Sequence, residues 1–498
     1  MDPKPTLEVV HSDTSFFGHP RGLATLFFTE MWERFSYYGM RALLILFMTA
    51  SVAKGGLGFP VVKAGAIYGF YTAMVYLLSL PGGWVADRIF GQRRAVIYGG
   101  ILIASGQFFL MSPGVQGFYA GLALLMLGTG LLKPNVSTMV GKLYAQGDRR
   151  RDSGFSIFYM GINLGGLIAP LPVGYLGERV SWRLGFGLAG LGMVAGLIQY
   201  MLGSKYLGTA GLHPVTPENP EAGKRLKRNV GLGAAAAALI LGAVGVLAAT
   251  GRMEISAERV SAGLGLVLII VSVAIFAWLL LGRGWTVTER KRSAAILVLF
   301  LASSVFWAAY EQAGSSLNLF AERSTNRMVL GFQFPASWFQ FVPSFFVMIL
   351  APVFAWLWIA LGKREPSSPS KFAIALVLGG IAFAILVPPA RATLTGALVS
   401  PWWLAGTYFL QTAGEMCLSP VGLSAMSKLA PARVAGMMMG LFFVSISIGD
   451  YLAGMAASVY ESMPLPELFG VVACFAFAAA AVLALLIRPT VKLMSGVN

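Results

Sequence analysis

Fourteen apolar stretches of about 20 residues recur along this 498-residue chain, and each is long enough to cross the hydrocarbon core of a bilayer as a helix. Charged residues make up only 12% of the chain, about half the share of a soluble protein. Continuous apolar runs are not the alternating pattern of a membrane barrel. The sequence therefore predicts an all-α polytopic membrane protein with 14 transmembrane helices. The stretches centre near Leu44, Ala73, Ile103, Leu125, Gly161, Leu191, Ala238, Ile270, Phe300, Phe346, Leu376, Tyr408, Phe443 and Phe477.

The net charge of +16 becomes an orientation signal once the cations are sorted by side. With the N-terminus placed inside, 25 of the 37 Lys and Arg residues fall in inner loops and tails, nine in outer loops and three within the spans. Such an excess follows the positive-inside rule and predicts that both termini are cytoplasmic. We expect a multi-pass protein of the cell inner membrane rather than a nucleic-acid-binding protein.

The chain divides around a polar, proline-containing stretch after the sixth span. Two uncharged spans follow it, and six more spans complete the chain. A 6 + 2 + 6 order is typical of a transporter built from two related halves. We predict a cytoplasmic N-tail (1–21), a six-helix bundle (22–206), a linker with two additional helices (207–292), a second six-helix bundle (293–488) and a cytoplasmic C-tail (489–498).

Eight ionisable side chains fall inside the predicted spans, and each would cost about 2.5 to 3.5 kcal/mol in lipid. They must therefore face one another or a water-filled cavity. They are Glu30, Glu33, Arg34, Arg41, Lys133, Glu311, Glu415 and Asp450. Together they carry a charge of −2 when ionised, which favours bound cations or protonated carboxylates.

The first span carries a polar stripe whose spacing places its members on one helical face. Two interpretations of this stripe remain open. The Glu30 and Arg34 side chains, four residues apart, could simply neutralise each other inside a bundle, or the stripe could form a polar cavity wall. The members of the stripe are Glu30, Glu33, Arg34, Tyr37, Tyr38 and Arg41.

Charged residues also occupy corresponding places in the two halves. The first span of each half holds glutamate, with Glu30 and Glu33 in one and Glu311 in the other. The fourth span of each half holds a charge near a proline, Lys133 in one and Glu415 in the other. Charged, proline-interrupted segments at matching positions indicate a binding site near the membrane midplane.

Several motifs resemble those of the proton-dependent oligopeptide transporter family, a branch of the major facilitator superfamily. EMWERFSYYG at 30–39 is similar to the family's ExxERFxYYG signature, and the motifs follow one another in order along nearly the whole chain. The additional helix pair resembles that of bacterial members. The other motifs are GWVADR at 83–88 with GQRR at 91–94, GLLKPN at 130–135, FYMGINLG at 158–165, FWAAYEQ at 306–312 and GEMCLSPVGLS at 414–424.

The resemblance implies the major facilitator fold and the import of di- and tripeptides by symport with protons, which would be the coupling ion, with no other cofactor and no metal. It implies proton coupling by Glu30, Glu33, Arg34 and Glu311. It implies substrate binding by Arg41, Lys133, Tyr37, Tyr38, Tyr76, Asn163, Glu311, Glu415 and Phe442. Arg41 and Lys133 would hold the peptide carboxylate, Glu415 and Asn163 would hold its amino group, and Lys133 with Glu415 would form a gating pair.

Three positions depart from the family pattern. Val342 replaces an Asn, Phe442 aligns with a common Trp, and Asp450 stands where Asn is usual. Asp450 either adds a titratable group or caps a wet helix end. A second gating pair on the outer side, Lys63 with Glu322, competes with the interpretation that both are solvated loop charges.

Two other functions compete with peptide symport. Plant relatives of this family are known for nitrate transport, but a simple anion has no amino end for Glu415 to hold. A membrane-embedded hydrolase or acyltransferase would need a nucleophile constellation that the sequence does not offer, and we predict that the chain is not an enzyme. We assume a monomer whose partners are peptides, protons and the lipid bilayer.

Overall fold

The computed structural model describes residues 7–145, 147–214 and 256–496, with short runs at 225, 228–233, 235–236, 239 and 250. Ten helical runs in the described part are long and apolar enough to cross a membrane. Three further helices, α2 (Arg21–Thr49), α5 (Gln92–Leu110) and α17 (Trp402–Leu429), have 29, 19 and 28 residues. Thirteen of the fourteen predicted span centres therefore lie in helices, ten of them in runs long and apolar enough to cross a membrane, and the one centred near Ala238 lies outside the described residues.

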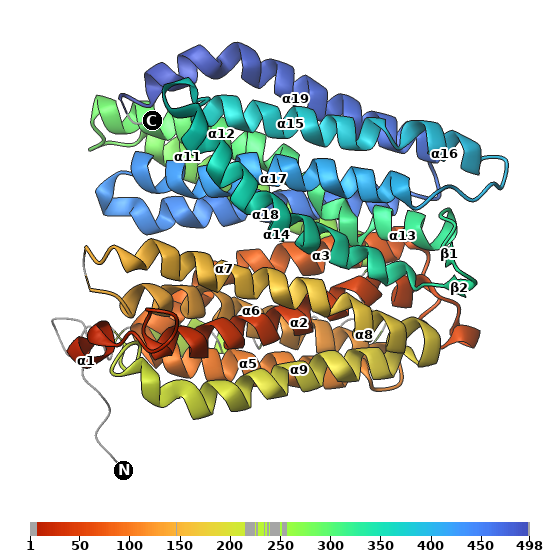
Figure 1. The fold of residues 1–498 in the computed structure, drawn as a ribbon, viewed down its shortest axis with the longest axis horizontal. Helices are drawn as coiled ribbons and strands as arrows, with labels where there is room; N and C mark the ends of the chain where they lie inside the picture. The colour runs from red at the N-terminus through yellow and green to blue at the C-terminus, as the bar shows by residue number, and fades with distance from the viewer. Residues whose placement is uncertain are drawn as a thin grey trace.

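The first half of the chain forms one group of helices, drawn in red to yellow in Figure 1. Its α-helices besides α2 and α5 are α1 (Leu7–Ser12), α3 (Val61–Leu77), α4 (Ser79–Val85), α6 (Val115–Lys142), α7 (Arg150–Ile168), α8 (Pro170–Tyr175) and α9 (Trp182–Gly203). Single turns of other helical types are η1 (Val52–Lys54), η2 (Ala86–Phe90), η3 (Leu176–Val180) and η4 (Ser204–Leu207).

The second half forms the other group, drawn in green to blue in Figure 1. Its α-helices besides α17 are α11 (Ala257–Leu281), α12 (Val287–Tyr310), α13 (Ser316–Arg323), α14 (Phe341–Leu361), α15 (Ser368–Ala384), α16 (Val387–Thr393), α18 (Ala435–Ser458) and α19 (Leu465–Leu493). Its short elements are η5 (Glu311–Gly314), η6 (Ala336–Gln340), η7 (Gly362–Arg364), η8 (Ala432–Val434), β1 (Met328–Val329) and β2 (Phe332–Gln333). The two strands pair antiparallel, with Met328 opposite Gln333.

Local chemistry explains where the functionally important helix α12 starts and stops. Thr286 and Glu289 form a capping box at its start, where each side chain accepts a hydrogen bond from the other residue's backbone N–H. Its regular hydrogen bonding ends at Glu311, where the chain turns into the 3₁₀ segment η5 before α13 resumes. The span is therefore discontinuous at its one intramembrane glutamate.

The two bundles pack against each other at one end, which we call the outer end because the predicted orientation would place it there. Apolar packing of the first bundle continues there into Leu317, Phe320 and Phe339 of the second bundle. Glu178, in the middle of η3, accepts hydrogen bonds from the backbone N–H groups of Ala336 and Ser337, at 2.9 and 2.8 Å. The outer end is therefore closed.

Backbone contact between α3 and α18 extends this closure towards the middle of the molecule. A Cβ atom at Gly69 would lie 2.8 Å from the Cα of Gly454, and one at Gly65 would lie 2.6 Å from the backbone nitrogen of Ser458. Such distances leave room only for glycine. The hydroxyl of Ser447 donates to the carbonyl of Ala73 at 3.0 Å further along the same interface.

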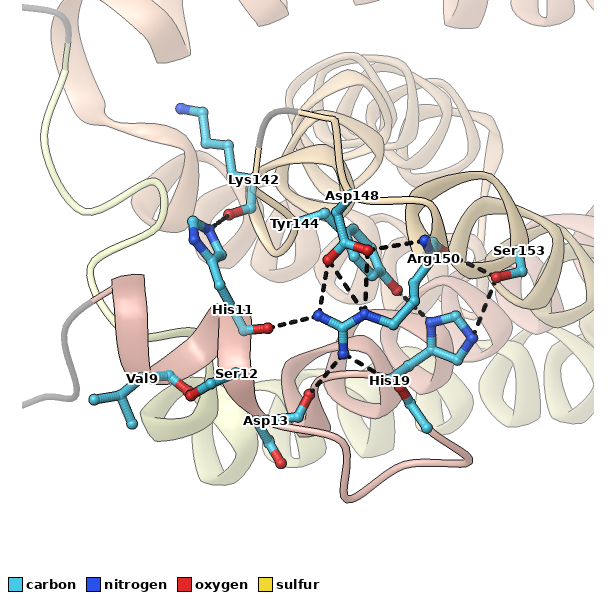
Figure 2. Close-up of polar contacts among 11 residues, drawn as sticks. Val9, His11, Ser12, Asp13, His19, Lys142, Tyr144, Asp148, Arg150 and Ser153 are labelled. Carbon is cyan, nitrogen blue, oxygen red and sulfur yellow. Dashed lines mark hydrogen bonds and ion pairs between the residues drawn. The ribbon is translucent and has the colours of Figure 1, made fainter.

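At the opposite end, the N-terminal segment is fastened to the α6–α7 loop by Arg150, as Figure 2 shows. Its guanidinium donates to the backbone carbonyls of His11 at 2.6 Å and of Asp13 and Gly18 at 3.3 Å. It also forms an ion pair with Asp148 at 2.7 Å. Hydrogen bonds from the guanidinium and the backbone N–H of Arg150 to the carboxylate hold the pKa of Asp148 below its ordinary value. The ion pair therefore persists above the ordinary aspartate pKa and weakens only as the pH falls below it.

Replacing Arg150 with alanine should release the N-terminal segment. We expect amide hydrogen exchange of residues 11–20 to accelerate by about tenfold, the scale of losing hydrogen bonds from a charged donor. Arg149→Ala is the matched control, because Arg149 is exposed and makes none of these contacts. Equal exchange rates in the two variants would contradict this assignment.

Candidate functional site

The charged stripe on α2 forms a buried cluster within the first bundle. The Nε atom of Arg34 lies 3.1 Å from a carboxylate oxygen of Glu30 and 2.5 Å from one of Glu33. All three side chains are buried, and Glu33 is completely so. Lys133 on α6 lies within electrostatic range of all three. The self-neutralising Glu30–Arg34 pair is therefore present, but Glu33 and Lys133 extend it into a four-charge cluster.

About two turns beyond this cluster on α2, Arg41 joins the two bundles. Its guanidinium pairs with the carboxylate of Glu311 at the break between α12 and α13. Its Nε donates to the hydroxyl of Tyr68 on α3 at 2.7 Å. Arg41, Tyr68 and Glu311 are all buried, so this ion pair connects the bundles below the outer closure. Sequence reasoning assigned Arg41 to the substrate carboxylate and missed Tyr68, for which the sequence carries no signal beyond a tyrosine in an apolar span.

Lys133 and Glu415, the predicted gating pair, are not joined in this conformation. The Nζ of Lys133 lies 3.6 Å from the ring centroid of Tyr76 on α3, a cation–π contact. Glu415 on α17 accepts a hydrogen bond from the hydroxyl of Tyr310 at 2.6 Å. A cation from one bundle and a carboxylate from the other thus each rest against a tyrosine. Tyr310 lies in the FWAAYEQ motif, and this motif was the one feature of the sequence that could have pointed to its contact with Glu415.

The remaining aromatic and polar site residues lie around these groups. Tyr38, which is partly exposed, is within electrostatic range of charged groups from both bundles, including Glu311 and Glu415. Tyr37 is buried, and its ring lies 5.1 Å from the guanidinium carbon of Arg34. The amide of Asn163 donates to a carbonyl of its own helix α7 at 3.0 Å.

Phe442 lies apart from this group. Its ring packs against the backbone of Gly422 on α17, inside the core of the second bundle. The adjacent Phe443 instead stacks on Tyr76 across the bundle boundary, with ring centroids 6.4 Å apart. Neighbouring side chains on a helix point in different directions, so only one of these two phenylalanines can face the other bundle. The alignment of Phe442 with a common Trp did not show which one does.

The expected outer pair of Lys63 and Glu322 is not formed in this conformation. Lys63 places its Nζ 4.0 Å from the ring centroid of Phe59, and Glu322 lies 3.5 Å from Arg323. Glu322 also lines an outer hollow of about 320 Å³ with Glu178. Lys63 lies in the first turn of α3 and Glu322 in the last turn of α13, and the closed outer end is held by other groups.

Asp450 lies within the body of α18 and is completely buried. It is not a wet helix end, so the capping interpretation was wrong. Its carboxylate lies within electrostatic range of Arg41 and Glu311.

A two-bundle helical membrane protein with buried, paired charges between its halves belongs to the class of membrane transporters with the major facilitator fold. Comparison with known proteins identifies the family. A model described as the POT family matches residues 93–471, and the chain belongs to this family.

Curated relatives match almost end to end. An uncharacterised transporter, YclF, of Bacillus subtilis is 43% identical, with 96% of this chain and 95% of the relative covered. The peptide transporter YePEPT of Yersinia enterocolitica is 41% identical, with 97% and 96% covered. A di-/tripeptide transporter of Lactococcus lactis subsp. cremoris is 37% identical, with 98% and 99% covered.

A crystal structure of the peptide transporter POT in complex with sulfate has the same fold. Its TM-score is 0.91 at 42% sequence identity, and the match covers 99% of this chain and 98% of that one. The chain is therefore a multi-pass membrane transporter and not an enzyme.

Proposed function

We propose that this chain imports di- and tripeptides together with protons, by alternating access at a central site between the two bundles. The names of the Yersinia enterocolitica and Lactococcus lactis relatives as peptide transporters support peptides as the substrate class. The observation that carries the proposal is the placement of Lys133 and Glu415, which come from opposite bundles and each contact a tyrosine instead of each other.

A short peptide is a zwitterion, and this placement offers a partner for each of its ends. Lys133 would hold the carboxylate and Glu415 the ammonium group, with Asn163 beside it as a neutral hydrogen-bonding group. Two fixed end partners favour short peptides because the ligand length must match their separation. Side chains of the peptide would meet the aromatic groups Tyr38 and Tyr76, which adapt to varied shapes.

Proton coupling would use the cluster on α2. Protonation of Glu30 or Glu33 would remove one partner of Arg34 and change the balance of charge around Lys133. Peptide binding would then compete for Lys133 and Glu415 and release the bundles to move. One charge moving inward through 100 mV supplies about 2.3 kcal/mol, which corresponds to about fiftyfold accumulation.

The outer pair of Arg41 and Glu311 would act as a gate that must separate before the site opens outwards. Opening would also free Arg41 for the peptide carboxylate and expose Glu311 to protons or to the peptide. In the outward-open state we expect Lys133 and Glu415 to pair on the other side of the site. We propose that Lys63 and Glu322 pair in a conformation other than the one described here.

We place the protein in the cell inner membrane as a monomer with both termini in the cytoplasm, and with protons as the coupling ion and no other cofactor. Two features support this arrangement. The inner loops carry most of the cations, and α1 and the C-terminal end of α19 lie at the same end of the molecule (Figure 1).

Uptake of a labelled dipeptide into proteoliposomes with an imposed inward proton gradient tests the proposal. We expect accumulation that an ionophore abolishes, with competition by di- and tripeptides and little by tetrapeptides or free amino acids. N-acetylated and C-amidated dipeptides should compete poorly because each lacks one charged end. Competition by nitrate, or formation of a hydrolysed product, would contradict the proposal.

A further inference from the structure

Asp450 is a buried carboxylate with no role in the mechanism above. It lies on α18, which packs along α3 at the boundary between the bundles, and its side chain is 0% exposed. Neither carboxylate oxygen has a hydrogen-bond partner in the described structure. Thr72 on α3 is close by, but its hydroxyl donates to the backbone carbonyl of Tyr68 at 2.9 Å.

The charges around Asp450 do not neutralise it. Arg41 is the cation of the outer pair, and it is already committed to Glu311 and to the hydroxyl of Tyr68. Asp450 is thus a second acid within electrostatic range of Arg41, which already pairs with Glu311. Lys133 is the other cation within electrostatic range of Asp450. The titratable and charged groups within electrostatic range of it are Arg41 and Tyr37 on α2, Tyr68 and Tyr76 on α3, Lys133 on α6 and Glu311 in η5.

The outer closure seals Asp450 from the outside. Gly454 lies one helical turn further out on α18 and touches the backbone of Gly69, and Ser458 lies one turn beyond and touches Gly65. Opening of the outer end must separate α3 from α18, and this movement exposes the carboxylate to external water. The same interface therefore controls both the access of peptide and the access of water to Asp450.

A fully buried carboxylate whose neighbouring hydroxyl donates to another acceptor is disfavoured in its ionised form. We propose that Asp450 is a proton-binding site separate from Glu30 and Glu33, loaded from external water when the bundles part on the outside and held as the neutral acid until internal water reaches it. The O–H bond forms with a proton from external water, and the proton leaves to internal water after the bundles move. This inference rests on the proposed function and adds one proton to each transport cycle.

The number of protons per peptide tests this site directly. In proteoliposomes, the peptide gradient that just balances a known membrane potential and pH gradient gives the ratio. Asp450→Asn should carry one proton fewer than the wild type, which lowers the equilibrium accumulation about fiftyfold at 100 mV. Exchange of labelled for unlabelled peptide without a proton gradient should persist, because the neutral amide mimics the protonated acid.

Two controls separate the site from general effects. Glu461→Gln removes an exposed outer acid that pairs with Arg323 at 2.7 Å and should leave the ratio unchanged. Asp450→Glu should restore the wild-type ratio. An unchanged ratio in Asp450→Asn would overturn the proposal.

Infrared spectroscopy tests the protonation of Asp450 without transport. At neutral pH the wild type should show the C=O stretch of a protonated carboxylic acid that Asp450→Asn lacks. Absence of this difference would overturn the proposal even if the variant were inactive. If the wild type does not take up peptide with protons, the proposed function is contradicted. The spectroscopic comparison would still show whether Asp450 is protonated.

Discussion

Replacing Glu33 with glutamine is expected to lower proton-driven accumulation of a dipeptide by about fiftyfold at 100 mV, the drive that one coupled charge supplies. Glu33 is completely buried against Arg34, at 2.5 Å. The amide keeps the size and the hydrogen-bonding oxygen of the acid but cannot bind and release a proton. Arg34 keeps Glu30 as a partner at 3.1 Å, so the fold and peptide exchange should persist.

Accumulation and exchange should be measured in the same proteoliposome preparation, with an imposed pH gradient for the first and without one for the second. Glu467→Gln is the matched control, because Glu467 is an exposed acid in the first turn of α19. Full pH-driven uptake by Glu33→Gln would show that the proton-coupling assignment is wrong. If Asp450 binds a separate proton, the two losses should multiply in the double variant.

The helices could be predicted from the sequence because membrane crossing is a local property. A run of about 20 apolar residues forms a helix whatever the rest of the chain does, and thirteen predicted centres lie in observed helices. The pairing of Glu30 and Arg34 was also predictable, because four residues span one helical turn. Both conclusions depend only on neighbouring residues.

The contacts between distant helices could not be predicted in the same way. Arg41 and Glu311 are 270 residues apart, and their pairing depends on how the two bundles meet. The separation of Lys133 from Glu415 depends on which conformation is populated, and the sequence encodes both conformations. Sequence reasoning therefore found the charged residues of the site, but it did not find Tyr68 or Tyr310. It also chose Phe442 for the bundle boundary, where the structure has Phe443.

Replacing Gly454 with leucine is expected to prevent closure of the outer end. A Cβ atom there would lie 2.7 Å from the backbone nitrogen of Gly69, and backbone atoms cannot move aside without shifting α3 or α18. Overpacking of this kind costs about 1 to 3 kcal/mol or more, so the closed state should lose about tenfold or more of its population. Peptide uptake should fall accordingly, because each cycle requires outer closure.

Gly470→Leu is the matched control, because a Cβ atom at Gly470 on α19 would meet nothing within 4 Å. Spin labels at Lys54→Cys and Leu394→Cys, with the exposed Cys474 replaced by serine, report the distance between the outer ends of the two bundles. Gly454→Leu should lengthen this distance, bind peptide from the outside and fail to deliver it. An unchanged distance with normal uptake would show that the contact between Gly454 and Gly69 does not close the outer end. It would also contradict the inference that this contact seals Asp450 from external water.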